Sequence, residues 1–88
     1  MPEIGYPPGF EWDGPKAQAN LAKHGVDFVL ATLVFAGPHR IMQDERAYQG
    51  ETRYKAVGEA DGRPLFVVFT WREGRRRIIS ARIAGSRR

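Results

Sequence analysis

The sequence has 88 residues, 42% of them hydrophobic, a formal net charge of +4 and no cysteine. A chain of this length forms one domain with a modest core, and without cysteine it has neither a disulfide framework nor thiolate chemistry. Two histidines without a carboxylate cluster argue against a metal site,. No apolar run approaches the roughly 20 residues that span a membrane, and the first residues do not resemble a signal peptide. We therefore expect a cytoplasmic protein without metal or cofactor.

The charge is concentrated near the C-terminal end of the sequence. Residues 1–71 contain seven Lys or Arg and nine Asp or Glu, a net charge of −2, whereas residues 72–88 contain seven Arg and one Glu, a net charge of +6. Positive charge gathered in one segment indicates a polyanionic partner, either a nucleic acid or an acidic protein.

The chain begins with an arm and a short strand. Prolines and glycines exclude a helix from residues 1–9, which we interpret as an N-terminal arm before a single domain at 10–88,. Phe10–Asp13 alternates apolar and acidic residues, which predicts a short strand with its aromatic side chains facing inward.

Two helices follow. Asp13 is a suitable N-cap for a helix near Pro15–His24, and Gly25 is a suitable residue to end it,. Asp27 begins a second, strongly apolar helix that extends to Ala36, where a Gly-Pro pair stops it. The two segments predict an αα-hairpin.

The remaining sequence reads as strands. A strand is expected near Arg40–Gln43, followed by an exposed turn at Asp44–Gly50. Glu51–Glu59 alternates in the manner of a half-buried strand, and Asp61-Gly62 is a strong turn signal.

The densest pattern is a hairpin made of Leu65–Arg72 and Arg76–Ile83, with Glu73-Gly74-Arg75 as the expected loop,. This register gives one apolar face and one polar face, because a one-residue slip would mix the two sets. The apolar face contains Leu65, Val67, Phe69, Trp71, Ile79, Ala81 and Ile83. The polar face contains Thr70, Arg72, Arg76, Ser80 and Arg82.

The order of elements predicts an α+β domain, with both helices on one face of a three- or four-stranded antiparallel sheet. The other face is open, and we expect Arg53, Arg72, Arg76 and Arg82 to converge there. A planar guanidinium binds phosphate oxygens with two hydrogen bonds, which suits a phosphate backbone. The alternative reading is that these residues protect an exposed strand from aggregation.

Two groups of residues resemble the BrnT family, and together they cover about residues 10–84. The first group is Phe10-Glu11-Trp12-Asp13, Lys16, Asn20, Lys23-His24-Gly25-Val26 and Phe28. The second group is Arg53, Gly58 and Ile78-Ile79-Ser80-Ala81-Arg82. The resemblance implies a RelE-like ribonuclease toxin of a type II toxin–antitoxin system that inhibits translation and growth.

The resemblance also implies a partner. BrnA antitoxins carry a ribbon-helix-helix domain, so contact with operator DNA is expected only through the antitoxin, in a complex that forms a dimer or heterotetramer. We expect an acidic or amphipathic helix of the antitoxin to occlude the basic face.

RNA cleavage without metal needs a base for the 2′-hydroxyl, an acid for the leaving 5′-oxygen and cations for the charged phosphorane. The catalytic candidates are His24, Arg53, Arg72 and Arg82, and the RNA-binding candidates are Lys23, Arg76, Arg77 and Ser80. Imidazole transfers protons near neutral pH, although a histidine at a helix C-terminus also binds the last carbonyls. We expect Arg82 to be the main phosphate clamp. Without the resemblance, a non-catalytic nucleic-acid binder and a protein-interaction domain remain open.

Overall fold

The computed structural model describes residues 7–48 and 50–85, of which 45–48 are described by their backbone alone. The elements are β1 (Phe10–Trp12), α1 (Gly14–His24), α2 (Phe28–Thr32), the 3-10 helix η1 (Leu33–Ala36), β2 (His39–Tyr48), β3 (Glu51–Ala60), β4 (Arg63–Arg72) and β5 (Arg75–Ile83). The predicted α+β class is confirmed. Most of the expected arm, residues 1–6, lies outside the described residues.

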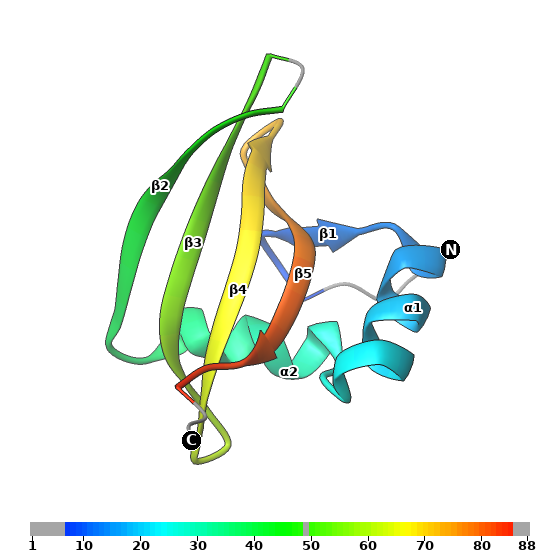
Figure 1. Cartoon of the computed structure of the whole chain (residues 1–88), viewed down its shortest axis with the longest axis vertical. Coiled ribbons are helices and arrows are strands. Elements are labelled where there is room, and N and C mark those ends of the chain that lie inside the picture. The colour runs from blue at the N-terminus through cyan, green and yellow to red at the C-terminus, as the bar shows by residue number, and fades with distance from the viewer. Residues whose placement is uncertain (1–6, 49, 86–88) are drawn as a thin grey trace.

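The strands form one five-stranded sheet in the order β1-β5-β4-β3-β2 (Figure 1). The pairs from β2 to β5 are antiparallel, whereas β1 runs parallel to β5. The expected three- or four-stranded antiparallel sheet is therefore a mixed sheet with five strands, because the N-terminal strand joins its edge.

The helices begin and end at the residues that the sequence indicated. Asp13 accepts a hydrogen bond from the backbone N–H of Lys16 (3.0 Å), and Gly25 ends α1 in the left-handed conformation with φ 71°. Asp27 accepts one from the N–H of Val29 (2.7 Å). The second helix is α-helical for little more than one turn and then tightens into η1, as short terminal turns often do,. No single helix of the described chain is long and apolar enough to span a membrane; α1 and α2–η1 pass that test only as a pair bent by 93°.

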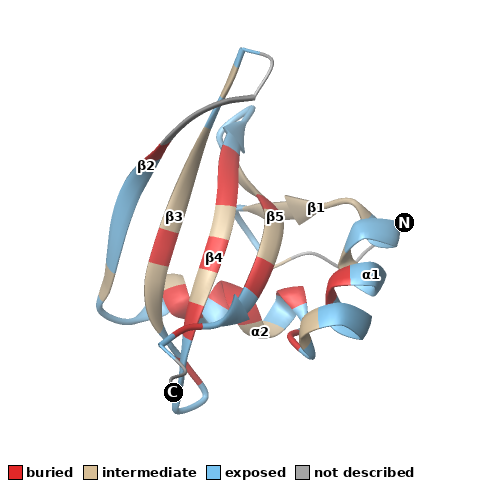
Figure 2. Cartoon of the chain, viewed as in Figure 1, coloured by how far each residue is buried: buried red, intermediate tan, exposed pale blue. Residues whose placement is uncertain are grey.

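The core lies between the sheet and the helices that cover one face of it (Figures 1 and 2). Its members are Val26, Phe28, Ala31, Val34, Ala56, Ala60, Leu65, Val67, Phe69, Ile78 and Ala81. Removing one such Val, Leu or Phe side chain from water stabilises the fold by about 1.5–3 kcal/mol. Gly58 lets the helical layer approach β3: an added Cβ would lie 3.1 Å from Val34 Cγ1 and 3.0 Å from the carbonyl oxygen of Pro38.

The β4–β5 turn is shorter than expected. Arg72 pairs with Arg75, so the loop contains only Glu73 and Gly74, with φ values of 53° and 80°. Two consecutive positive φ angles are typical of the tight turn whose twist matches an antiparallel hairpin. The expected three-residue loop is therefore wrong.

A β-bulge compensates for the missing loop residue. Val68 pairs with Ser80, the next pair is Phe69 with Ile78, and Ile79 is left without a partner on β4. An extra residue of this kind reverses the alternation of side chains along the bulged strand. The predicted register therefore holds from the bulge to the end of β5 and is shifted by one residue between the turn and the bulge.

The expected turn at Asp44–Gly50 is also corrected, since β2 continues to Tyr48. Asp44 pairs with Arg53 and is only 8% exposed, rather than lying in a solvated loop. The acidic and basic residues suggested a turn by composition, but cross-strand pairing of opposite charges supports a strand equally well.

Candidate functional site

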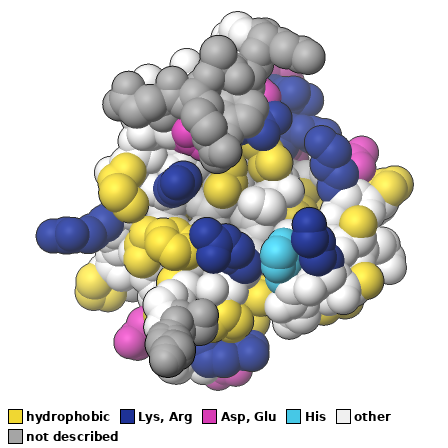
Figure 3. All heavy atoms as spheres, viewed as in Figure 1, with side chains coloured by type: hydrophobic (Ala, Val, Ile, Leu, Met, Phe, Trp, Pro, Cys, Tyr) yellow, Lys and Arg dark blue, Asp and Glu magenta, His cyan; other side chains and the backbone are white. Residues whose placement is uncertain are grey.

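The face of the sheet opposite the helices carries a band of cations, and we call it the arginine face. Side chains directly opposite in paired strands share a face, so the register defines its members. Its basic residues are Arg40, Arg53, Lys55, Arg72, Arg75, Arg77 and Arg82. Figure 1 views this face, because α2 passes behind the strands, and Figure 3 shows basic side chains spread across it, two of them flanking a histidine.

Near the β4–β5 turn, several of these guanidiniums form ion pairs with carboxylates. Glu11 on β1 accepts a hydrogen bond from Arg77 at 2.9 Å and lies 3.7 Å from Arg75, with only 14% of its own side chain exposed. Glu51 accepts from Arg53 Nε at 3.2 Å. Much of the positive charge at this end of the face is therefore compensated within the chain.

Beyond the bulge, β5 borders a hollow of about 290 Å³ that we call the α1–β5 cleft. Its lining consists of Lys16, Ala19, Asn20, Lys23, His24, Ile79 and Ser80. None of these residues is acidic. The structure thus brings together three of the sequence candidates, Lys23, His24 and Ser80, from segments more than fifty positions apart.

Asn20 explains why the cleft exists. β1 pairs only with the part of β5 from Arg76 to Ile78, so the strand edge beyond it needs other partners. The Asn20 amide donates to the carbonyl oxygens of Ala81 (2.8 Å) and Val26 (3.1 Å), and its oxygen accepts from the N–H of Ala81 (3.2 Å). One buried side chain therefore replaces the missing strand and anchors α1 on β5.

The helix period then places cations beside the strand. Lys16 lies four positions before Asn20, and Lys23 and His24 lie three and four positions after it. Residues at these spacings share one side of a helix, so all three lie on the Asn20 side of α1. Because Asn20 is fixed to β5, these side chains line the cleft together with Ser80.

Arg82 lies at the border of the arginine face and is exposed. Its guanidinium is 4.8 Å from the centroid of the Phe66 ring, directly across the strand pair. A cation over an aromatic ring is held in place while its N–H groups stay available to a ligand. Within the described chain Arg82 has no ion-pair partner.

Arg76 and Arg77 exchange faces relative to the expected register. Arg77 lies on the arginine face, whereas Arg76 points to the helix side, 4.7 Å from the ring centroids of Phe35 and Trp71. Its Nε is buried without a hydrogen-bond partner in the described chain. The geometry fits an aromatic cage better than a phosphate contact, so the expected position of Arg76 among the RNA-facing arginines is wrong.

The aromatic residues that were predicted to face the core are only in part buried. Trp12 and Phe69 pack in or against the core as expected, but Trp71 is 49% exposed. His39 is the first residue of β2; its ring centroid lies 5.3 Å from that of Phe35, and its Nδ1 is 2.8 Å from the carbonyl oxygen of Gly37.

Two cations near the site were missed at the sequence level. Lys16 lines the cleft, and its spacing of four residues from Asn20 was the available signal,. Lys55 pairs with Val68, which pairs with Ser80, so it lies in the same row across the arginine face. The alternation of β3 placed Lys55 beside Arg53, but nothing in the sequence gave that row a role.

The fold and the cleft first define a class: a small α+β protein with cations on its open sheet face and an imidazole in the adjoining cleft. The described residues contain no group of three or more His, Cys, Asp or Glu that could hold a metal ion.

The sequence matches the family of ribonuclease toxins, BrnT, of type II toxin–antitoxin systems over residues 12–87. Since the match covers most of the chain, the protein belongs to the BrnT family. Membership implies an RNA substrate and an antitoxin partner. A search of curated protein sequences finds no match.

Proposed function

We propose that this toxin cleaves RNA at the α1–β5 cleft by a metal-independent transesterification. The observation that carries this proposal is the convergence of Lys23, His24 and Ser80 in a hollow without acidic lining, two residues along β5 from Arg82, whose guanidinium has no ion-pair partner in the described chain. These groups suit a reaction in which negative charge grows on a phosphate and protons move between oxygens.

In the proposed reaction the RNA 2′-oxygen forms a bond to phosphorus and the bond to the 5′-oxygen breaks. The products are a 2′,3′-cyclic phosphate and a 5′-hydroxyl. The 2′-oxygen loses a proton and the leaving 5′-oxygen gains one; His24 transfers one of these protons and water transfers the other, while Arg82 binds the nonbridging oxygens and stabilises their charge in the transition state. Lys23 binds a neighbouring phosphate, and Ser80 donates a hydrogen bond to a phosphate oxygen.

The remaining arginines extend the binding surface. Arg53, Arg72 and Arg77 lie on the arginine face toward the β4–β5 turn, where a single strand of RNA leaving the cleft along β5 would pass. We keep Arg53 and Arg72 as candidates for charge stabilisation and Arg77 as a binding residue. Arg76 is removed from this set, because its guanidinium is enclosed by rings on the other side of the sheet.

For the partner, we propose a BrnA-like antitoxin with a ribbon-helix-helix domain. An acidic or amphipathic segment of the antitoxin would cover the arginine face and exclude RNA, and operator DNA would be bound through the antitoxin alone. We propose that the toxin acts in the cytoplasm, on RNA and together with its antitoxin.

The test uses the full chain, purified without its antitoxin, and a structured RNA in buffer with EDTA. Cleavage in EDTA that leaves 2′,3′-cyclic phosphate ends is the expected result. The variant His24→Gln should be about 100-fold slower, the usual magnitude for removal of a proton-transfer group. The matched change His39→Gln, at a histidine far from the cleft lining, should leave the rate unchanged.

Two results would contradict the proposal. Cleavage that requires a divalent metal would refute the metal-independent mechanism. Protection of RNA without cleavage, with an affinity that falls steeply with salt, would instead indicate a non-catalytic nucleic-acid binder.

A further inference from the structure

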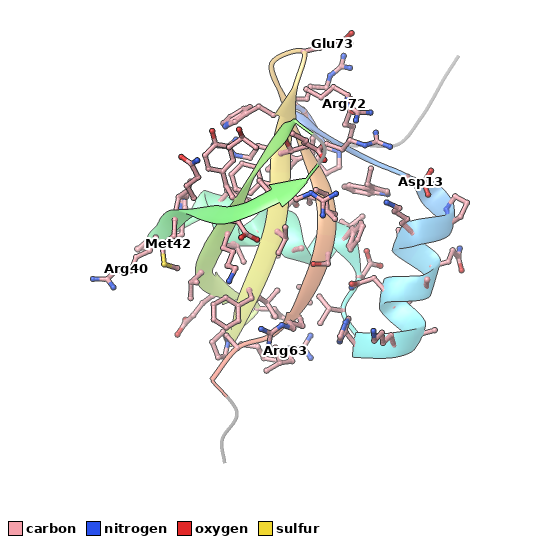
Figure 4. The ribbon with its side chains drawn as sticks, turned by 45° about the horizontal axis from the view of Figure 1, so that its top comes forward. Asp13, Arg40, Met42, Arg63, Arg72 and Glu73 are labelled. Carbon is pink, nitrogen blue, oxygen red and sulfur yellow. The ribbon has the colours of Figure 1, made fainter. Side chains whose placement is uncertain are left out.

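A second hollow lies where the two hairpins of the sheet separate. β3 and β4 pair from Ala60 and Arg63 as far as Tyr54 and Phe69, and β4 then continues only with β5. The β2–β3 hairpin reaches beyond the β4–β5 turn (Figure 1), where Arg72 and Glu73 lie at the far end of β4 from Arg63 (Figure 4).

We call the resulting hollow the hairpin notch. Its volume is about 230 Å³, and its lining consists of Gly50, Glu51, Thr52, Tyr54, Thr70 and Trp71. The lining includes neighbouring residues of both strands, whose side chains point to opposite faces. The notch is therefore placed at the strand ends and is reached from the arginine face as well as from the helix side.

Two contacts hold the walls of the notch in place. The hydroxyl of Thr70, a residue only 4% exposed, donates to the carbonyl oxygen of Thr52 at 2.6 Å and ties the two hairpins together. Tyr54 stacks on Phe69 with ring centroids 5.5 Å apart and an interplanar angle of 28°. Neither wall needs to be ordered when a ligand enters, which lowers the entropic cost of binding.

Trp71 offers an exposed aromatic surface on one wall. Its ring meets Phe69 edge-on at 5.9 Å and is covered by the Arg76 guanidinium at 4.7 Å, yet 49% of the residue remains exposed. A large indole fixed in this way and still exposed is an unusual feature for a surface strand, and it is suited to stacking with a planar ligand.

From these features we propose that the hairpin notch binds one nucleobase of the RNA substrate and so gives cleavage a sequence preference. This inference rests on the proposed ribonuclease function. Trp71 supplies the stacking surface, and Glu51 supplies a carboxylate at the rim. Glu51 already accepts from Arg53 through Oε1, so the pair presents both an acceptor and a cation close to the base and its phosphate.

The carboxylate predicts which bases are favoured. A carboxylate accepts hydrogen bonds from amino groups such as that of cytosine, and adenine and guanine also carry an amino group. Uracil has no amino group and offers a carboxylate only its N3–H, which lies between two carbonyl oxygens that repel the carboxylate. The notch should therefore select a base with an amino group against uracil.

The location is compatible with the proposed cleft. Trp71 is three residues along β4 from Val68, the partner of Ser80, which corresponds to about 10 Å along a strand and places its side chain on the opposite face of the sheet. A base in the notch would thus belong to a nucleotide near the scissile phosphate, and the RNA would reach Trp71 through the gap between the two hairpins.

The test measures binding of 2′-O-methyl oligoadenylate, oligocytidylate and oligouridylate, which cannot undergo the proposed cleavage because the attacking hydroxyl is blocked. The wild type should bind the first two more tightly than oligouridylate. Trp71→Ala should weaken binding of oligoadenylate on the order of 10-fold, the scale of one lost base-stacking contact. The matched control is Leu33→Ala, which removes an equally exposed apolar side chain (48%) from η1, outside the notch.

Glu51→Gln tests selectivity separately from affinity. The glutamine amide donates to a carbonyl oxygen of uracil, so the preference over oligouridylate should fall several-fold. Circular dichroism should show that both variants are folded at the temperature of the binding assay, although loss of the Trp71 contacts with Phe69 and Arg76 lowers the unfolding temperature of Trp71→Ala.

The inference is overturned if Trp71→Ala and Leu33→Ala bind oligoadenylate equally, or if Trp71→Ala weakens only the antitoxin complex, which would make the notch a protein contact. Oligouridylate bound as tightly as the others would remove the assigned selectivity. These outcomes are independent of cleavage. If the wild type never cleaves RNA but Trp71→Ala still weakens oligonucleotide binding, the proposed ribonuclease function is refuted and the base-binding site is retained.

Discussion

The two halves of β5 have opposite electrostatic surroundings, although both carry arginines toward the same face. Between the turn and the bulge, β5 pairs with β1, and Glu11 holds Arg75 and Arg77. Beyond the bulge, β5 is flanked by α1, whose residues at the cleft are basic or uncharged. Arg82 lies in this second half, stacked on Phe66 and without a carboxylate in the described chain.

The difference shows that a count of arginines does not identify a phosphate site. A guanidinium bound to a partly buried carboxylate must give up or share that bond before it can bind a phosphate, and the carboxylate repels the incoming anion. A guanidinium held by an aromatic ring meets neither obstacle. The neighbouring strand or helix, rather than the arginine itself, decides which of the two cases applies.

The largest effect is expected from the unpaired arginine. Arg82→Ala should slow RNA cleavage by about 100-fold and abolish growth inhibition, since it removes a cation that stabilises the transition state. Arg75→Ala is the matched control on the same strand and face; its side chain is 57% exposed, and its 3.7 Å contact with Glu11 is long. The measurement is the cleavage rate of purified protein together with bacterial growth during controlled expression.

A folded and fully toxic Arg82→Ala variant would contradict the claim that the two halves of β5 differ in their ability to bind phosphate. The proposed site would then move toward Lys23, His24 and Arg53. Equal losses in Arg82→Ala and Arg75→Ala would show that the total positive charge matters and that pairing does not.

The second effect concerns the anchor that separates the halves. Asn20→Ala should lower the free energy of unfolding by about 2–3 kcal/mol, because it leaves the buried N–H and C=O of Ala81 without partners,. Cleavage should fall further than stability alone explains, since α1 loses its fixed position against β5. Gln18→Ala, an exposed change on the same helix, should alter the free energy of unfolding by less than about 0.5 kcal/mol in urea denaturation,.

If Asn20→Ala unfolds like the wild type, β5 does not need the helix as a substitute strand, and another contact must hold the cleft together. That outcome would contradict the claim that the hydrogen bonds of Asn20 position α1 beside β5.

The smallest effect is expected from releasing the paired arginines. Glu11→Gln should destabilise the fold by about 1 kcal/mol, since the ion pairs are partly exposed,. It should also strengthen RNA binding by about threefold and steepen its dependence on salt, because two guanidiniums become available to phosphates. Fluorescence anisotropy with a labelled RNA at several salt concentrations measures both quantities.

Glu73→Gln is the control for Glu11→Gln, because it removes the same charge from an exposed turn position without breaking an ion pair of the described chain. A similar gain in both variants would mean that net charge alone governs the affinity. In that case the contrast between the two halves of β5 would have no bearing on RNA binding.

Much of the fold follows from local signals in the sequence. The N-caps Asp13 and Asp27 and the left-handed Gly25 fix the helices, and these preferences act within a few residues. The apolar run of β4 and the glycine of its turn fix the last hairpin. The length of β2 was missed, because an acidic and basic segment has no local preference that separates a turn from a charged strand.

The site was predictable in part. Placement of Arg53, Arg72, Ser80 and Arg82 on the open face agrees with the alternation of β3, β4 and the end of β5. Arg76 and Arg77 were exchanged, because a two-residue turn with a bulge and a three-residue loop without one contain the same number of residues. Only packing separates these alternatives: the bulge allows Ile78 and Ala81 both to face the core.

The sequence by itself therefore determined the class of fold, the helix ends, the concentration of positive charge near the C-terminal end and the resemblance to a ribonuclease toxin family, because each depends on composition or on short-range spacing. The tertiary structure alone decided which cations are free. Whether an arginine meets Glu11, a ring or open solvent depends on which elements lie beside β5, and that arrangement arises from burial of the core and from the three hydrogen bonds of Asn20. Such contacts join residues far apart in the chain, and no local pattern encodes them.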